Sequence, residues 1–439
     1  MQGIAARLGL NRPELRAWVL YDFANSAFQT TIIAAVFPIY FQRVAAADLP
    51  ASVATSRFAW ATTIAICIVA IVAPVLGALA DTRKLKKPLL GIFLGIGAGA
   101  TAAMYGIHEG DWKLALVLFV IGNVGVAGSI VFYEALLPHI ARGDELDRVS
   151  TAGYAIGYLG GGLLLGLNLA MIQQPQWFGI SDAGVATRLS FVSVAAWWVL
   201  FSWPLFRRVP EPRVAPAVSM SAGDALAQSV RQLASTFREL RRYRQASLLL
   251  LAFFLYNDGI QTIIRMAAIY GAEVGIDQSA LIGALLLVQF VGVPCSFAFG
   301  ALAGRIGPKK AVMIGLTAYT GIVIFTYFMN DAREFYMLAG AVGMIQGGTQ
   351  GLSRSMFASM IPRHRSSEFF AFFGVFERYA GVLGPAIFAV MAGLGSSRTA
   401  ILTLIPFFVI GMFLLMKVNV AAGRREAAAG EAATGAEVL

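Results

Sequence analysis

Twelve apolar segments, each about as long as a bilayer is thick, follow one another along this chain, and they constrain its fold more than any other feature. The hydrocarbon core of a membrane needs roughly 20 apolar residues per crossing helix. We therefore predict an all-α integral membrane protein with twelve transmembrane helices. The expected spans are residues 18–41, 57–80, 88–107, 114–137, 150–172, 189–206, 247–271, 280–303, 310–329, 335–359, 368–392 and 399–418.

The composition fits a membrane protein and argues against a soluble one. Of the 439 residues, 58% are hydrophobic and 13% are charged, whereas a soluble domain carries about 25% charged residues. The formal charge of +10 does not indicate nucleic-acid binding, because the charges cluster in short segments between the apolar runs. The three histidines lack metal-ligand spacing, and no phosphate-binding P-loop motif occurs. We expect no metal, no cofactor, no catalytic residue and no nucleic-acid partner.

The distribution of basic residues predicts how the helices are oriented. If the N-terminus is placed inside, the segments on that side hold 26 of the 34 lysines and arginines. Cytoplasmic loops are enriched in these residues, so both termini are predicted to be cytoplasmic. Two arginines, Arg265 and Arg378, lie inside predicted spans instead.

An internal repeat divides the chain into two parallel halves. The sequence Gly-Ala-Leu-Ala at 77–80 recurs at 300–303, and Leu137-Pro138 recurs as Ile361-Pro362. Both copies enter the membrane from the same side, so each half contains an even number of helices. Six plus six helices in the same orientation is a known arrangement of transporters.

This repeat sets the expected domain boundaries. Residues 1–206 form the N-terminal six-helix half, 207–246 a cytoplasmic linker and 247–420 the C-terminal six-helix half. The linker is predicted to contain a basic amphipathic helix over about 221–244, which would lie on the inner leaflet; binding of a regulatory partner is the alternative. The Ala/Glu/Gly-rich residues 421–439 are predicted to be a disordered tail.

The loop after the second span carries the first resemblance to a known family. The segment GALADTRKLKKP at 77–88 resembles the signature loop of the major facilitator superfamily, of form G-x-x-x-D-x-x-G-R-K/R-x-K/R. Gly77, Asp81, Lys86 and Lys87 fit this form, whereas Lys84 and Leu85 stand where glycine and arginine are usual. The resemblance implies that the loop helps to latch the cytoplasmic gate.

Two further stretches narrow the family. WVLYDFANSAFQTTIIAAVFPIYF at 18–41 resembles the first helix of the vacuolar amino-acid effluxer (autophagy-related) family, whose bacterial relatives are known as unknown major facilitators. QGGTQGLSRSMFASMIP at 346–362 and EFFAFFGVFERYAGVLGP at 368–385 are similar to its helices 10 and 11. The resemblance covers about residues 14–420 and implies an efflux or uptake permease, with amino acids as the cargo of some members.

Polar residues within the spans mark a candidate solute pathway. A charge at the middle of a bilayer costs roughly 2.5–3.5 kcal/mol on insertion scales, so each one needs a reason. In spans 1 and 7 the polar residues recur at i, i+3 and i+7, which places them on one helical face. Contact with a solute or a coupling ion is one reading, and internal pairing that steadies the bundle is the other. The candidate residues for solute or ion contact are Asn25, Gln29, Asn257, Asp258, Gln261, Arg265, Gln346, Gln350, Glu377 and Arg378.

A second group of residues is predicted to act in gating. Glu134 lies one turn before Pro138 near the cytoplasmic end of span 4, within reach of the basic loop after span 2. Asp22 lies close to the same end of span 1, where anchoring of the helix is as good an explanation as ligand contact. The gating candidates are Asp22, Gly77, Asp81, Arg83, Lys86, Lys87, Glu134 and Arg354.

These observations together predict a permease rather than an enzyme, because no nucleophile–base pair lies at membrane depth. We expect a secondary active transporter that moves a small solute by alternating access, with an amino acid as candidate cargo and coupling to protons by symport or antiport. An organic-anion or drug efflux permease, or a receptor that binds without translocating, are the alternatives. The expected partners are the solute, membrane lipids and protons. The expected state is a monomer in a bacterial inner membrane.

Overall fold

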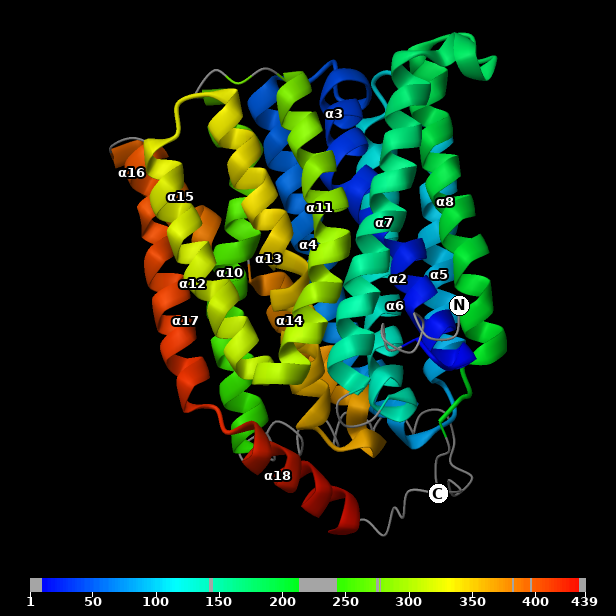
Figure 1. The fold of residues 1–439 in the computed structure, drawn as a ribbon. Helices are drawn as coiled ribbons and strands as arrows, with labels where there is room; N and C mark the ends of the chain where they lie inside the picture. Colours follow the sequence, from blue (N-terminus) through cyan, green and yellow to red (C-terminus); the bar gives the residue numbers. More distant parts are fainter. Residues whose placement is uncertain are drawn as a thin grey trace.

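The fold is given by a computed structural model (Figure 1). It describes residues 10–141, 145–212, 243–273, 276, 278–380, 383–394 and 397–433. Every regular element in this part of the chain is helical. The long helices stand side by side as one bundle, and helix α18 (Val420–Ala433) lies across one end of it, the lower end in Figure 1. We call this the α18 end.

In the first half of the chain, up to residue 208, the first helix is enclosed by its neighbours. Helix α2 packs against both α7 and α8, and α5 packs against both α6 and α8. Apart from short 3-10 helices, the elements of this half are α2 (Pro13–Ala27), η1 (Phe28–Ala35), α3 (Val36–Tyr40), η2 (Phe41–Ala45), α4 (Ala51–Thr82), α5 (Lys86–Ala103), α6 (Trp112–Ile140), α7 (Glu145–Gln173) and α8 (Ala183–Arg208).

The second half repeats this plan and meets the first along two seams. Helix α11 packs against α13, while α17 packs against α10 and α12. One seam joins α7 to α11 and α13, and the other joins α14 to α4 and α6. The elements are α10 (Arg244–Glu273), α11 (Gln278–Ile306), α12 (Pro308–Phe328), α13 (Ala332–Ser359), α14 (Ser366–Tyr379), α15 (Leu383–Leu394), α16 (Ser397–Ile401) and α17 (Ile405–Lys417).

Nine helices in the described part of the chain are long and apolar enough to cross a membrane. They coincide with the predicted spans 2 to 9 and 12. The predicted span 10 corresponds to α13, which has the expected length but carries a polar stripe. Spans 1 and 11 are each divided into shorter pieces. The count of twelve therefore remains a prediction.

The division of span 1 has a local cause, and that of span 11 is marked by a residue outside the helical conformation. In span 1 a π-helix, Phe28–Ala35, precedes Pro38. Proline lacks the amide donor and its ring clashes with the carbonyl one turn earlier, so the helix must distort there. In span 11, Ala380 is extended, with φ −59° and ψ 126°, and ends α14. Helix α15 then begins at Leu383.

In each half a lysine at the start of the third helix contacts the end of the last helix, although the predicted repeat pairs Lys309 with Lys86 and not with Lys87. Lys87 lies at the start of α5 and its Nζ donates to the carbonyls of Phe206 and Val209, at the end of α8. Lys309 lies at the start of α12 and donates to the carbonyls of Met416 and Val418, at the end of α17. Each cation satisfies carbonyls that the end of a helix leaves unpaired. In each half, the start of the third helix is thus joined to the end of the last helix by the same kind of contact.

The C-terminal prediction was wrong where the structure describes it, because residues 420–433 form α18 instead of a disordered tail. Alanine, glutamate and arginine favour helix, and two glutamates hold the helix in place. Glu426 accepts from the Gln245 amide at 3.3 Å, and Glu431 accepts from the Arg363 amide at 2.8 Å. The linker helix predicted over about 221–244 lies outside the described residues, except for its last two positions, 243 and 244.

The glycines of α7 let it approach span 1 closely, and this can be tested. A side chain at Gly160 would meet the backbone carbonyl of Phe23, whereas one at Gly166 would meet open space. Overpacking of this kind costs about 1–3 kcal/mol. We expect Gly160→Ala to lower the thermal unfolding temperature of the detergent-solubilised protein. Gly166→Ala is the matched control and should leave it unchanged or raise it, and equal effects of the two substitutions would contradict the packing argument.

Candidate functional site

The guanidinium of Arg354 ties the two halves of the chain together near the α18 end. Arg354 lies on α13 in the second half and is 2% exposed. Its Nε donates to the Ser150 hydroxyl at 2.9 Å and its Nη2 donates to the Ser150 carbonyl at 2.8 Å. Ser150 belongs to α7 in the first half. Nη2 also donates to Asp22 of α2 at 3.3 Å, and Nη1 lies 3.7 Å from the carboxylate of Glu134 on α6. We call these four residues the Arg354 cluster.

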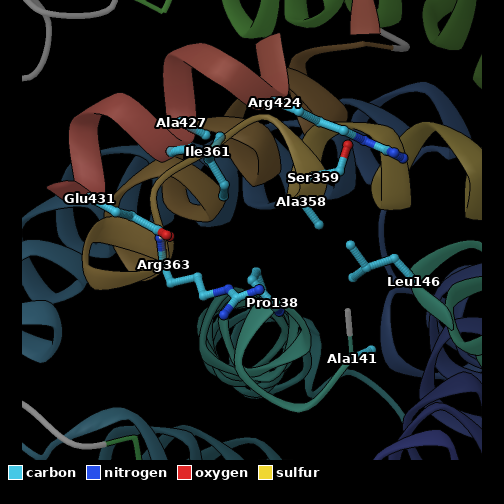
Figure 2. Close-up of a pocket in the computed structure, with 11 residues that line it drawn as sticks. Pro138, Ala141, Leu146, Ala358, Ser359, Ile361, Arg363, Arg424, Ala427 and Glu431 are labelled. Atoms are coloured by element: carbon cyan, nitrogen blue, oxygen red, sulfur yellow. The ribbon is translucent and has the colours of Figure 1, made fainter. Parts of the chain in front are cut away.

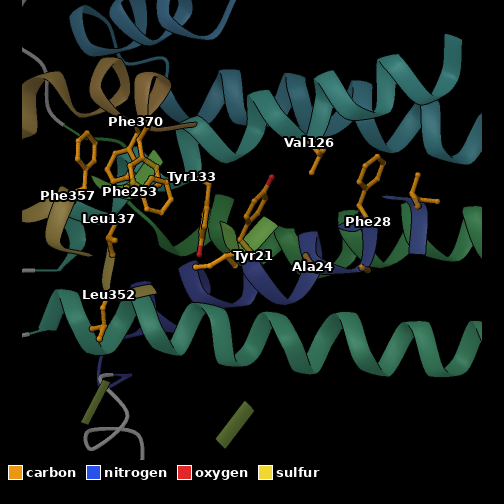
Figure 3. Close-up of a cluster of buried hydrophobic side chains, with 14 of the residues drawn as sticks. Tyr21, Ala24, Phe28, Val126, Tyr133, Leu137, Phe253, Leu352, Phe357 and Phe370 are labelled. Atoms are coloured by element: carbon orange, nitrogen blue, oxygen red, sulfur yellow. The ribbon is translucent and has the colours of Figure 1, made fainter. Parts of the chain in front are cut away.

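Aromatic rings enclose this cluster. The Arg354 guanidinium lies 4.6 Å from the ring centre of Tyr154, 5.0 Å from that of Trp18 and 5.9 Å from that of Tyr133. Trp18 stacks on Tyr133 at 4.3 Å. Tyr133 also stacks on Tyr21, and these two rings are labelled in Figure 3. The Tyr133 hydroxyl donates to Asp22 at 2.7 Å. The rings exclude water while their faces favour a cation.

The cluster holds two carboxylates, those of Asp22 and Glu134, around one guanidinium. Its formal charge is −1 when both carboxylates are ionised. Burying an ion costs several kcal/mol unless it is paired and hydrogen-bonded. The pairing is therefore strong, but a proton taken up by either carboxylate would remove the remaining charge. This arrangement holds the halves together through one buried cation.

A second charged contact joins the halves at the other seam. Asp81, at the end of α4, accepts from the backbone amides of Ser367 at 3.1 Å and Glu368 at 2.8 Å. These amides open helix α14, whose N-terminus favours a negative charge. Asp81 also forms a buried ion pair with Lys86, which donates to the Ser367 hydroxyl at 2.7 Å. We call Asp81, Lys86 and the first turn of α14 the latch.

The other predicted gating residues surround the latch. At Gly77, α4 passes close to α14, because a side chain there would lie 2.8 Å from the Ser367 carbonyl. Lys87 binds the end of α8, as described above, and Arg83 lies in the turn after α4. Glu211, in the linker, accepts from the amides of Lys86 and Lys87 at 2.7 and 2.9 Å and so caps α5.

The predicted solute-contact residues of the second half form a network of their own. Gln350 donates to the side-chain oxygen of Asn257 at 3.4 Å, and Asn257 donates to the backbone carbonyl of Glu377 at 3.3 Å. Asp258 is fully buried and accepts from the backbone amide of Gly384, near the start of α15, at 2.8 Å. Its carboxylate thus meets a helix N-terminus.

The remaining candidates are placed as follows. Asn25 is buried and its side-chain oxygen has no hydrogen-bond partner among the described residues, as is also true of the side-chain oxygen of Gln346. Gln29 and Gln261 are half-buried. The side chains of Arg265 and Arg378 lie outside the described part of the structure.

A pocket of about 190 Å³ lies at the α18 end, away from these mid-depth residues (Figure 2). Both halves and α18 contribute to its walls, and Arg363 extends toward Pro138 at the end of α6. It is lined by Pro138, Ala141, Leu146, Ala358, Ser359, Ile361, Arg363, Arg424, Ala427, Ala428 and Glu431.

Comparison with known proteins decides the family. The family model described as "Vacuole effluxer Atg22 like" matches residues 10–428. The chain belongs to the Atg22-like family. It is 35% identical over 410 residues to the uncharacterized MFS-type transporter YxiO of Bacillus subtilis, covering 91% of this chain and 93% of that one. It is 24% identical over 315 residues to autophagy-related protein 22 of Yarrowia lipolytica, covering 65% of this chain and 52% of that one.

Solved structures place this Atg22-like chain in the fold of the major facilitator superfamily. The transporter FucP in its outward conformation matches with a TM-score of 0.67 and 15% identity, covering 93% of this chain and 98% of that one. A bacterial homologue of the iron transporter ferroportin in its outward-facing state matches with a TM-score of 0.69 and 13% identity, covering 94% and 100%. The Atg22-like protein is a multi-pass membrane transporter of this superfamily, and not an enzyme.

Sequence reasoning missed several residues of the Arg354 cluster and of the latch. Ser150, Tyr133 and Tyr154 supply hydrogen bonds and ring faces, yet they are common residue types in apolar helices. Ser366 accepts from Lys86 at 3.3 Å and its hydroxyl lies 3.1 Å from His139 Nε2. The signal that could have found Ser366 and Ser367 is their place in front of Glu368, at the start of a predicted span.

The latch predicts a specific stability effect in this Atg22-like protein. Asp81→Asn would leave the Lys86 ammonium buried without its counter-charge, which costs about 3–5 kcal/mol. We expect a marked fall in the unfolding temperature measured in detergent. Adding Lys86→Met removes the unpaired cation and should restore much of the loss. If the double variant were no more stable than Asp81→Asn, the ion pair would not be the source of the stability.

Proposed function

We propose that this Atg22-like protein is a secondary active transporter that moves an amino acid across a bacterial inner membrane by alternating access, coupled to protons. The observation that carries the proposal is the Arg354 cluster. It joins the halves through one buried cation, near one end only. The family membership and the similarity to solved transporters support the transport part of the proposal.

The distribution of contacts between the halves supports a state that is closed at the α18 end. Thr151 packs against Gly300, and Gly77 against the Ser367 backbone, both near that end. Farther along the second seam, the Cys67 sulfur lies 3.8 Å from the Tyr379 hydroxyl, at the middle of the bundle. With the termini assigned to the cytoplasm by their basic residues, the described state is closed to the cytoplasm.

Opening to the cytoplasm would separate Arg354 from its partners. Arg354 belongs to the half that moves away from Asp22, Glu134 and Ser150. Once the guanidinium leaves, the two carboxylates lose their counter-charge, and each needs another cation. In the proposed mechanism, a proton takes this place at one of them. Proton binding and opening of the gate would therefore be linked, as coupled transport requires.

The mid-depth residues supply groups that suit an amino acid. Asn257 and Gln350 offer amides, and Asn25 and Gln346 have buried side-chain oxygens that no described residue satisfies. Such groups match the neutral polar parts of a small solute. Binding near the middle of the bundle, between the halves, is the common arrangement of carriers that rock about a central site.

Transport assays with purified protein in liposomes test the function directly. We expect uptake of at least one amino acid, without chemical change, that is driven by an imposed pH gradient. Binding of the amino acid without flux would favour the receptor alternative. Flux of organic anions but of no amino acid would favour the organic-anion permease.

The Arg354 cluster predicts the effect of a conservative substitution. Lysine keeps the charge but cannot donate to Ser150 and Asp22 together, because it has a single ammonium where arginine has a planar fork. We expect Arg354→Lys to lower the transport rate at least about tenfold, which corresponds to about 1.4 kcal/mol. In the Arg354→Lys variant, a cysteine introduced near the α18 end should also react faster with a water-soluble thiol reagent than the same cysteine does when Arg354 is kept. Unchanged flux and unchanged reactivity would contradict the gate.

The proposed coupling predicts a selective loss in Glu134→Gln. Glutamine keeps the shape of the side chain, but its amide does not take up a proton at the pH of a transport assay. We expect exchange of solute between the two faces to continue, while accumulation driven by the pH gradient is lost. Glu145→Gln is the control, because Glu145 forms a surface ion pair with Arg12 at the same end. Gradient-driven accumulation by Glu134→Gln at the rate of Glu145→Gln would exclude Glu134 from coupling.

A further inference from the structure

One tyrosine of the first half inserts into the second half at mid-depth. Tyr158 lies on α7, and its ring fits between Gly292 of α11 and Gly347 of α13. A side chain at Gly292 would come within 2.8 Å of that ring, and one at Gly347 would also overlap with it. Glycine at both positions is therefore what allows the ring to enter.

The hydroxyl of this tyrosine is buried, and no described residue bonds to it. Across Gly347 lies Ser296 of α11, which is 1% exposed, and its hydroxyl approaches the same glycine. Among the described residues, neither the Tyr158 hydroxyl nor the Ser296 hydroxyl has a hydrogen-bond partner. The side-chain oxygen of Gln346, the residue before Gly347, is buried in the same condition.

Unpaired polar atoms of this kind are uncommon. More than about 90% of buried polar groups in proteins have a partner, either protein or ordered water. The same protein contains the satisfied equivalent, because the buried hydroxyls of Tyr256 and Ser353 lie 2.5 Å apart. Tyr158 and Ser296 approach the same glycine, Gly347, but their hydroxyls do not hydrogen-bond to each other. A third group that donates and accepts would satisfy both.

The position of the pair fits a solute site. Tyr158 lies near the middle of α7 (Glu145–Gln173), Ser296 lies past the middle of α11 (Gln278–Ile306), and Gly347 lies near the middle of α13 (Ala332–Ser359). Solutes bind at this depth in carriers built from two parallel halves. The two hydroxyls also come from opposite halves, so an occupant would connect them.

We propose that Tyr158 and Ser296, with Gln346 beside them, form a subsite for one uncharged hydrogen-bonding group. In the empty carrier the group is water, and in the loaded carrier it is a hydroxyl or amide of the amino-acid cargo. The second part rests on the proposed function, and the first does not. Neutral hydroxyls, which donate and accept equally, select such a group over a charged one.

Hydroxyl-radical footprinting by radiolysis tests the water part without any cargo. Radicals form from bound water, so a buried tyrosine is oxidised rapidly only where water sits beside it. We expect Tyr158 to be modified several-fold faster than Tyr256, whose hydroxyl is also buried but is already paired with Ser353. Ser296→Ala should slow modification of Tyr158, because the water loses one of its two ligands. Ser353→Ala is the matched control and should leave the Tyr158 rate unchanged.

The cargo part is tested by adding the standard amino acids, each in turn, to the same experiment. Protection of Tyr158 by those with a hydroxyl or amide side chain, such as threonine or glutamine, and not by valine or leucine, would support it. Protection by none, or equally by apolar ones, would overturn it. A Tyr158 rate no higher than that of Tyr256 would overturn the subsite altogether. Because footprinting needs no flux, failure of the subsite is distinguishable from failure of transport.

Discussion

The rest of this structure depends on where one guanidinium can be placed in a largely apolar bundle. Arg354 needs counter-charges and acceptors because an unpaired cation at that depth is expensive. Its partners come from α2, α6 and α7 in the other half of the chain. Holding the halves together and neutralising the cation are therefore one requirement. Any motion that parts the halves must provide a new partner for each group, and water entering the gap is the available one.

Each of the two seams between the halves contains a buried charged contact, but the residues that supply it differ. At the α4–α14 seam, Asp81 binds both Lys86 and the first amides of α14. The repeat places Gly304 where Asp81 stands, and the α7–α11 seam is accordingly packed by small residues such as Gly300 against Thr151. On the same side, α13 adds the charged contact of Arg354 with Ser150 of α7. The two seams therefore differ in which half supplies the buried cation, because Lys86 comes from the first half and Arg354 from the second.

The sequence predicted the spans well where a helix is uninterrupted and poorly where it is not. Hydropathy cannot reveal that Phe28–Ala35 widens into a π-helix before Pro38, because the residues there remain apolar. Of the latch, Asp81 and Lys86 could be listed because they lie in a recognisable loop, whereas the first turn of α14 could not. The Arg354 cluster was only partly predictable, since Asp22, Glu134 and Arg354 could be listed but not paired. Pairing depends on which faces of distant helices meet. The tail was misjudged because the glutamates that hold α18 bond to backbone amides, which no side-chain pattern records.

Backbone amides also explain how the buried carboxylate of Asp258 is stabilised. The break at Ala380 leaves span 11 with two helix N-termini, one at Ser366 and one at Leu383, and each bears partial positive charge. Asp81 of the first half binds the amides of one, and Asp258 of α10 binds an amide of the other. Each of these two helix starts is thus met by a buried carboxylate. As a consequence, α14 is tied to the opposite half and α15 to its own. The two parts of span 11 are therefore held by carboxylates from different halves of the chain.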